Sequence, residues 1–126
     1  MKLGIIGSRS ITNDAFVLKT IHNYCVDNRP SVILKSSARG IDPAVGHFAK
    51  ANQIDTVNFL PYHLLDVNTN FDSKHFFIRT KQIVNNSDEV LIIWDTLSKG
   101  TEYAIKYAQK LKIPVKVVKL PPVNHS

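Results

Sequence analysis

The sequence has little cysteine, little glycine and no long apolar run. Its single cysteine, Cys25, excludes an intramolecular disulfide and suits a reducing compartment. The apolar run near the start, Leu3 to Ile6, is too short for the core of a signal peptide or for a membrane span. The sequence therefore predicts a cytoplasmic protein that has no membrane partner.

The balance of charge favours an anionic partner. The 126 residues carry a formal net charge of +6 at pH 7, and a positive field attracts nucleotides, nucleic acid or acidic proteins. Several lysines crowd into the last predicted helix and strand without forming a basic arm, so a solvated lysine-rich face is an alternative explanation. The length predicts one domain, which we place at residues 1–120, followed by a flexible tail at 121–126.

Strand-like and helix-like segments alternate along the chain. Asn13 and Asp42 are expected to cap the first two helices, with Pro43 at the first position of the second. Apolar and β-branched runs predict strands at 2–6, 31–35, 55–60, 89–94 and 114–120, and helical periodicity predicts helices at 14–26, after Asp42, from Asp72 or Ser73, and at 99–112.

This strict alternation predicts the fold class. We expect an α/β, Rossmann-like three-layer domain with a five-stranded parallel sheet, strand order 3-2-1-4-5, and helices on both faces. In such sheets the ligand lies beyond the carboxyl ends of the strands, at the switch between strands one and four. The loops that follow strands one, two and four should therefore meet at one site.

These three loops share small, polar and cationic residues of the kind that bind phosphate. Gly7 permits a tight turn, Ser8 offers a hydroxyl, and Arg9 offers a planar cation. The other two loops each open a helix, whose N-terminus favours an anion. The ligand-binding candidates in the loops are Gly7, Ser8, Arg9, Ser36, Ser37, Arg39, Gly40, Asp42, Ser98, Lys99, Gly100 and Thr101.

Each loop also has a purely structural explanation. The turn after the first strand is a common sequence of its kind. Arg39 can cover a helix end or pair with Asp42. Asp95 can act as a capping residue, and Gly100-Thr101 can simply begin a helix.

Four motifs, taken in order, resemble the SLOG superfamily and most closely its small YspA-like branch. They are Gly7-Ser8-Arg9, Ser37-Ala38-Arg39-Gly40-Ile41-Asp42, Arg79-Thr80 and Gly100-Thr101. The resemblance implies a nucleotide or nucleotide-derived ligand, held by a sensor or sequestering domain. It also implies that Arg9, Arg39 and Arg79 line the pocket and that Ser98 to Thr101 cradle phosphate.

The sequence departs from this family pattern at several positions. Ser36-Ser37 stands where the family has two glycines, so the backbone approaches a ligand less closely while hydroxyls are gained. Thr80 replaces an asparagine, and Phe76 occupies a position where a small residue is usual. Lys99 lies in a turn that is richer in glycine in the family, where it would act as a point charge.

An enzymatic alternative follows from the same resemblance. Relatives include the lonely-guy phosphoribohydrolases, which cut the N-glycosidic bond of nucleoside monophosphates. Such chemistry needs a carboxylate near the anomeric carbon. The glutamate of the family pattern falls at Ala104 here, so Glu102 and Asp95 are the candidate catalytic residues. Whether the protein is an enzyme stays open on the sequence.

Single-stranded nucleic acid is a third possible ligand. The phrase Ala38-Arg39-Gly40-Ile41-Asp42 also resembles the bacterial DNA-processing protein A, and the positive charge agrees with such a ligand. Against it, no aromatic stacking platform is evident in the sequence. We therefore rank nucleic acid below a small nucleotide-type ligand.

The sequence predicts neither a cofactor nor a metal site. None of the five histidines has metal-ligand spacing to the cysteine or to a pair of carboxylates. Homo-oligomerisation stays open, because Phe71, Phe76 and Phe77 can serve either a dimer face or an ordinary core.

Overall fold

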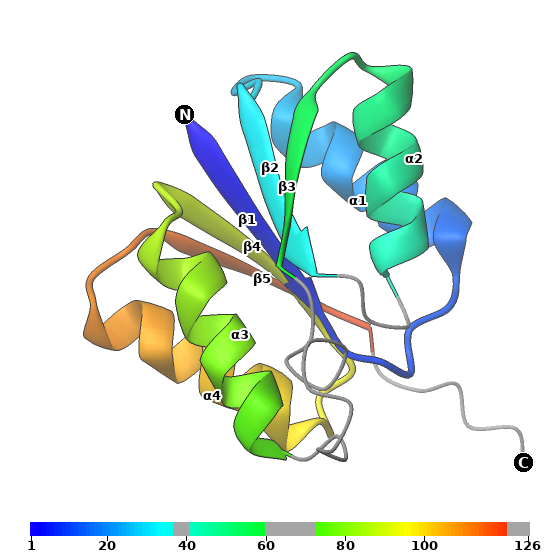
Figure 1. The fold of residues 1–126 in the computed structure, drawn as a ribbon. Coiled ribbons are helices and arrows are strands. Elements are labelled where there is room, and N and C mark those ends of the chain that lie inside the picture. Colours follow the sequence, from blue (N-terminus) through cyan, green and yellow to red (C-terminus); the bar gives the residue numbers. More distant parts are fainter. Residues whose placement is uncertain (37–40, 60–72, 121–126) are drawn as a thin grey trace, which may run out of the picture.

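The computed structural model describes residues 1–36, 41–59 and 73–120, and Figure 1 shows its fold. The predicted tail at 121–126 and the candidate residues Ser37, Arg39 and Gly40 lie outside the described residues. Strands and helices alternate as β1 (Lys2–Gly7), α1 (Asp14–Cys25), β2 (Val32–Ser36), α2 (Asp42–Ala51), β3 (Asp55–Phe59), α3 (Ser73–Asn85), β4 (Glu89–Trp94), α4 (Lys99–Lys110) and β5 (Val115–Lys119).

The strands form one parallel sheet in the order β3-β2-β1-β4-β5. Helices α1 and α2 cover one face, and α3 and α4 cover the other (Figure 1). The predicted Rossmann-like fold, strand order included, is therefore confirmed. The order changes direction between β1 and β4, whose carboxyl ends lie side by side through the pairing of Gly7 with Ile93.

Two apolar layers hold the sheet between its helices. Alternate residues of β4 serve the two layers: Leu91 and Ile93 face α1 and α2, and Val90 and Ile92 face α3 and α4. All four are fully buried, as expected for a central strand of a parallel sheet. Cys25 belongs to the first layer, where it packs as a buried apolar residue.

The element boundaries agree with the sequence to within about two residues, and two differences have a clear cause. Asp42 does not cap α2: the N-cap is Ile41, and the Asp42 carboxylate instead accepts a hydrogen bond from Ser36 Oγ at 2.9 Å. Helix α4 ends at Lys110 and not at Lys112, because Lys112 adopts a left-handed conformation with φ 60°. Asn13 caps α1 as predicted, accepting from the backbone N–H of Phe16.

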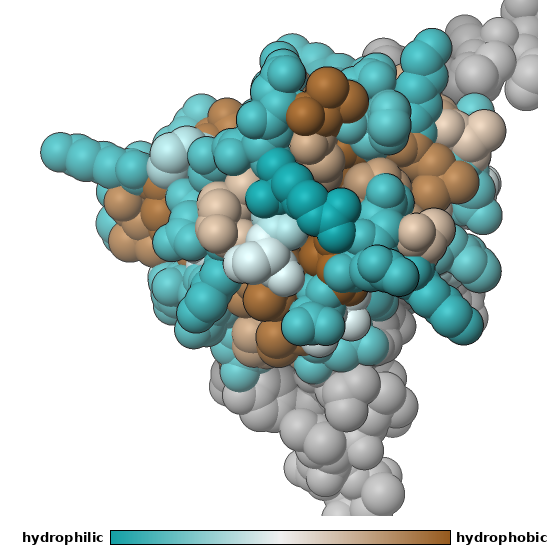
Figure 2. Space-filling model, turned by 90° about the horizontal axis from the view of Figure 1, so that it is seen from above, coloured by the Kyte–Doolittle hydropathy of each residue, from teal (hydrophilic) through white to brown (hydrophobic). Residues whose placement is uncertain are grey.

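Seen from the end where β1 begins, the surface is mostly hydrophilic, and hydrophobic side chains appear in small separate groups (Figure 2). No helix in the described parts of the chain is long and apolar enough to cross a membrane. That end of the sheet is opposite to the carboxyl edge, where the candidate residues gather.

Candidate functional site

A buried hydroxyl joins the first and third loops of the predicted site. Ser8, 1 % exposed, follows β1, and its backbone N–H donates to the carbonyl of Ile93 on β4. Its Oγ lies 3.0 Å from the hydroxyl of Thr101 and accepts a hydrogen bond from the backbone N–H of Asp95. Ser8 therefore holds together the turn after β1, the turn after β4 and the first turn of α4.

Asp95 organises the turn between β4 and α4. One of its carboxylate oxygens accepts from the backbone N–H groups of Leu97 and Ser98, and the other accepts from Ser10 Oγ at 2.6 Å. Burial alone would raise the pKa of this carboxyl, but these hydrogen bonds lower it below its ordinary value. Thr96, inside the turn, has φ 71°, a strained conformation for a β-branched residue, which the carboxylate helps to hold.

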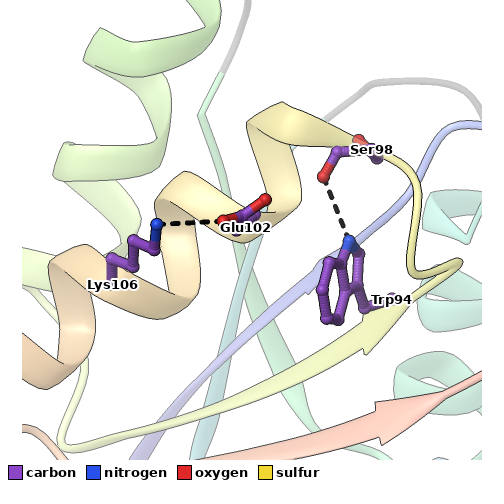
Figure 3. A network of polar contacts seen from close by, with 4 residues as sticks. All are labelled: Trp94, Ser98, Glu102 and Lys106. Carbon is purple, nitrogen blue, oxygen red and sulfur yellow. Dashed lines mark hydrogen bonds and ion pairs between the residues drawn. The ribbon is translucent and has the colours of Figure 1, made fainter.

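The first turn of α4 is capped by its own side chains. The hydroxyl of Ser98 accepts from the backbone N–H of Thr101 at 3.5 Å, and the Trp94 indole donates to the Ser98 carbonyl at 3.0 Å (Figure 3). Glu102 points along the helix to Lys106, 2.9 Å away (Figure 3). Both candidate catalytic carboxylates thus have partners in the fold, and a catalytic role for either remains a prediction.

A small recess at the same edge collects two arginines. Arg9, Ser36, Asp42 and Arg79 line it, and Gly7 and Thr80 lie among the remaining wall residues. Arg79 is 3 % exposed and Asp42 is 6 % exposed, whereas Arg9 is exposed. The structure thus brings together the predicted binding residues of β1, β2, α2 and α3.

The charged groups of this recess act on Arg79 in opposite directions. Burial lowers the pKa of Arg79, the Asp42 carboxylate opposes this shift, and the nearby Arg9 guanidinium adds to it. The described residues enclose about 20 Å³, which is room for about one water molecule. A ligand larger than this must lie at the mouth of the recess, where Arg9 is exposed.

Gly7, at the end of β1, allows the start of α2 to pack closely against it. A methyl group at this position would lie 2.4 Å from Cδ1 of Ile41, which is 1 % exposed. Only a residue without Cβ lets the start of α2 pack this closely against the end of β1. The glycine therefore places Asp42 beside the arginines, a packing role more than a ligand contact.

No family model matches the sequence, and no curated protein matches it. Among solved structures, the fold resembles that of DNA processing protein A from Helicobacter pylori, which was studied for its single-stranded DNA binding mode. The TM-score is 0.68 and the sequence identity is 22 %, over 93 % of this chain and 64 % of that chain. The likeness is one of fold. This chain corresponds to less than two thirds of the length of its neighbour, and membership of the YspA-like branch stays a prediction.

The structure also shows groups that sequence reasoning missed. Lys35, 9 % exposed, lies near the end of β2 with its ammonium 3.3 Å from the carbonyl of Ser36, so a buried cation contacts a residue that lines the recess. Tyr103 and Tyr107 of α4 were also missed, and they gather with Phe77 of α3, for which the sequence allowed a dimer face or the core. A signal for them was present, since Tyr103 and Tyr107 are four residues apart on one helix.

A larger hollow of about 570 Å³ lies beside α1, β4 and β5, away from the recess. Its wall is mainly apolar, from Phe16, Leu91 and Val118, with Lys19 and Lys116 also lining it. Its size and apolar wall would favour this hollow as a ligand site, but none of the predicted phosphate-binding residues lines it. The described residues contain no group of three histidine, cysteine or carboxylate side chains placed to hold a metal ion.

Proposed function

We propose that the carboxyl edge of the sheet binds single-stranded DNA through its phosphates. The observation that carries this proposal is the pairing of two guanidinium groups, Arg9 and Arg79, in a recess whose described wall contains one carboxylate, that of Asp42. This proposal reverses the ranking drawn from the sequence, which placed a small nucleotide first.

The charge of the recess supports an anionic ligand. The Asp42 carboxylate offsets the repulsion between the two guanidinium groups at Arg79, and a bound phosphate would add a second negative charge beside the exposed Arg9. Arginine also suits phosphate by geometry, because its planar fork can donate two hydrogen bonds to neighbouring oxygens. The net charge of +6 adds a long-range attraction for a polyanion.

The shape of the recess supports a strand more than an enclosed nucleotide. The described wall leaves room for about one water molecule, so a phosphate must lie at the mouth and its sugar and base must extend outside the recess. Arg9 is exposed at the mouth, where successive phosphates of a strand can pass. The fold neighbour binds single-stranded DNA, which supports the same choice of ligand.

The experiment is a fluorescence-anisotropy titration of a labelled 15-nucleotide single strand and a duplex of the same length. We expect tighter binding of the single strand, an affinity that falls as salt rises, and at least tenfold weaker binding by the Arg9→Ala variant. The matched control is Arg29→Ala, because Arg29 lies in the chain segment before β2, at the opposite edge of the sheet, and donates to the carbonyl of Asn52. Unchanged affinity in Arg9→Ala would refute the proposed site.

A small nucleotide is the second candidate ligand, and Asp42 favours it. A buried carboxylate beside two arginines can accept hydrogen bonds from a ribose hydroxyl or a base N–H, which a phosphate strand does not require. Thermal-shift measurements with nucleoside monophosphates, NAD and ADP-ribose test it. A rise in melting temperature that Asp42→Asn removes, with no binding of the oligonucleotide, would favour the small ligand. Chromatographic detection of free base in the same mixtures would indicate turnover and direct attention to Glu102 and Asp95.

A further inference from the structure

Helices α3 and α4 carry a row of three aromatic rings on their packed surfaces. The rings of Phe77 and Tyr103 lie with centroids 4.6 Å apart and planes tilted by 58°. The rings of Tyr103 and Tyr107 lie 6.0 Å apart and nearly parallel, at 17°. All three side chains are half-buried, so each is held in place while part of its ring remains open to solvent.

The far end of this row is fixed by polar contacts. The hydroxyl of Tyr107 donates to Oδ1 of Asn85 at 2.8 Å, and the ammonium of Lys81 lies 5.9 Å from the centre of the Tyr107 ring. The contact with Lys81 is a cation–π interaction between the two helices. These contacts orient the ring before any ligand arrives, which lowers the entropy lost on binding.

The surface around the row is basic. Lys81, Lys99, Lys106 and Lys110 are exposed on the two helices. The sequence of α3 contains no acidic residue, and that of α4 contains only Glu102, which is paired with Lys106. Aromatic rings set among lysines, with little opposing charge, are the composition of a surface that binds single-stranded nucleic acid.

The row and the recess share helix α3, which supplies Phe77 to the row and Arg79 to the recess. Phe77 lies two residues before Arg79 on α3, and Tyr103 lies two residues after Thr101 on α4. Both helices begin near the carboxyl edge of the sheet and run away from it side by side (Figure 1). Side chains two residues apart on a helix point to different sides of it, so a strand that leaves the arginines must cross α3 before it follows the row.

We infer that Phe77, Tyr103 and Tyr107 form a base-stacking platform for the strand whose phosphates bind at Arg9 and Arg79. This inference rests on the proposed function. It adds the path of the strand and the part of the nucleotide, phosphate or base, that each surface binds. The recess binds phosphate, whereas the platform binds bases through their faces, so the platform accepts any base sequence.

The test compares two oligonucleotides that carry the same phosphates. One is a 12-nucleotide strand of thymidine, and the other has the same backbone with abasic residues throughout. Because only the first can stack, we expect the protein to bind it about tenfold more tightly. Tyr103→Leu should reduce this preference to about twofold or less, and Tyr103→Phe, which keeps the aromatic face, should retain it.

The controls separate loss of stacking from loss of folding and from failure of the proposed function. Tyr24→Leu makes the same change on α1, on the opposite face of the sheet, and should keep the tenfold preference. Circular dichroism melts show whether Tyr103→Leu folds, and Phe77→Leu provides a second test of the row. Equal binding of both oligonucleotides by the wild-type protein would overturn the platform and leave the phosphate site standing. Binding of neither would overturn the proposed function itself.

Discussion

The hydroxyl of Ser8 lies 3.0 Å from the hydroxyl of Thr101, which joins the turn after β1 to the first turn of α4 across 93 positions of sequence. Both groups are buried, and the Ser8 oxygen also accepts from the backbone of Asp95. The turn after β1 and the turn that joins β4 to α4 are thus one hydrogen-bonded unit and not two independent turns.

Replacement of Ser8 should destabilise this assembly. Ser8→Ala leaves the Asp95 N–H and the Thr101 hydroxyl buried with one partner fewer, so we expect a loss of about 2 kcal/mol in the free energy of unfolding. Urea denaturation at pH 7 measures it. Ser31→Ala, at an exposed hydroxyl that donates to the carbonyl of Met1, is the matched control and should change stability by less than about 0.5 kcal/mol.

The carboxylate of Asp95 should make stability depend on acid pH. Its pKa lies below the ordinary value of 3.8, so the folded state favours the ionised form. The resulting stabilisation is complete above that ordinary value and is lost as pH falls through the lower pKa of the folded state. Asp95→Asn removes this contribution. The difference in unfolding free energy between wild type and variant should therefore be largest at pH 6 and shrink toward pH 2, and a constant difference would contradict the assignment.

Substitutions of Gly7 and Ile41 should have non-additive effects on stability, because the two residues are in tight contact. Gly7→Ala places a methyl group within 2.4 Å of the Ile41 side chain, and overpacking of this kind costs about 1–3 kcal/mol. Ile41→Ala in the same protein removes the clashing atoms, so the double variant should be more stable than the sum of the two single losses predicts.

Gly46 offers the matched glycine, because its added methyl group meets nothing nearer than Lys35 Cε at 3.8 Å. Gly46→Ala, inside α2, should stabilise the protein by about 0.5–1 kcal/mol. Thermal denaturation of Gly7→Ala, Ile41→Ala, the double variant and Gly46→Ala measures these changes in stability. Additive losses at Gly7 and Ile41 would argue against the contact.

Arg79 should contribute to stability as well as to ligand binding. Arg79→Ala removes the cation beside the buried Asp42 carboxylate, and breaking such a buried pair costs about 3–5 kcal/mol. Neutralising the carboxylate with Asp42→Asn in the same chain should restore part of that loss. Urea denaturation at pH 7 measures both, and a double variant no more stable than Arg79→Ala would show that the two charges do not act together. Arg79→Ala can weaken ligand binding simply by destabilising the fold. Arg9→Ala, at an exposed residue, is therefore the better test of ligand binding.

The fold and much of the edge that carries the site could be predicted from the sequence. The continuous apolar run of β4 and the helical periodicity between the strands predict a parallel sheet covered on both faces, because a strand without polar alternation is typically buried on both sides. The same pattern places the loops containing Ser8, Ser36 and Ser98 at one edge. Arg79 came from family resemblance instead, since a single arginine within a helix carries no local signal of burial.

Tertiary structure alone decided which of these residues share a recess and which serve the fold. Asp42 accepts a hydrogen bond from Ser36 Oγ instead of capping α2, and Asp95 accepts one from Ser10 Oγ. These partners belong to other segments, so they come within reach only after folding. The aromatic row arises in the same way, since Phe77 and Tyr103 belong to different helices whose packing no local pattern reports. Sequence periodicity specifies which face of an element is buried, whereas the contacts between elements depend on how those faces meet.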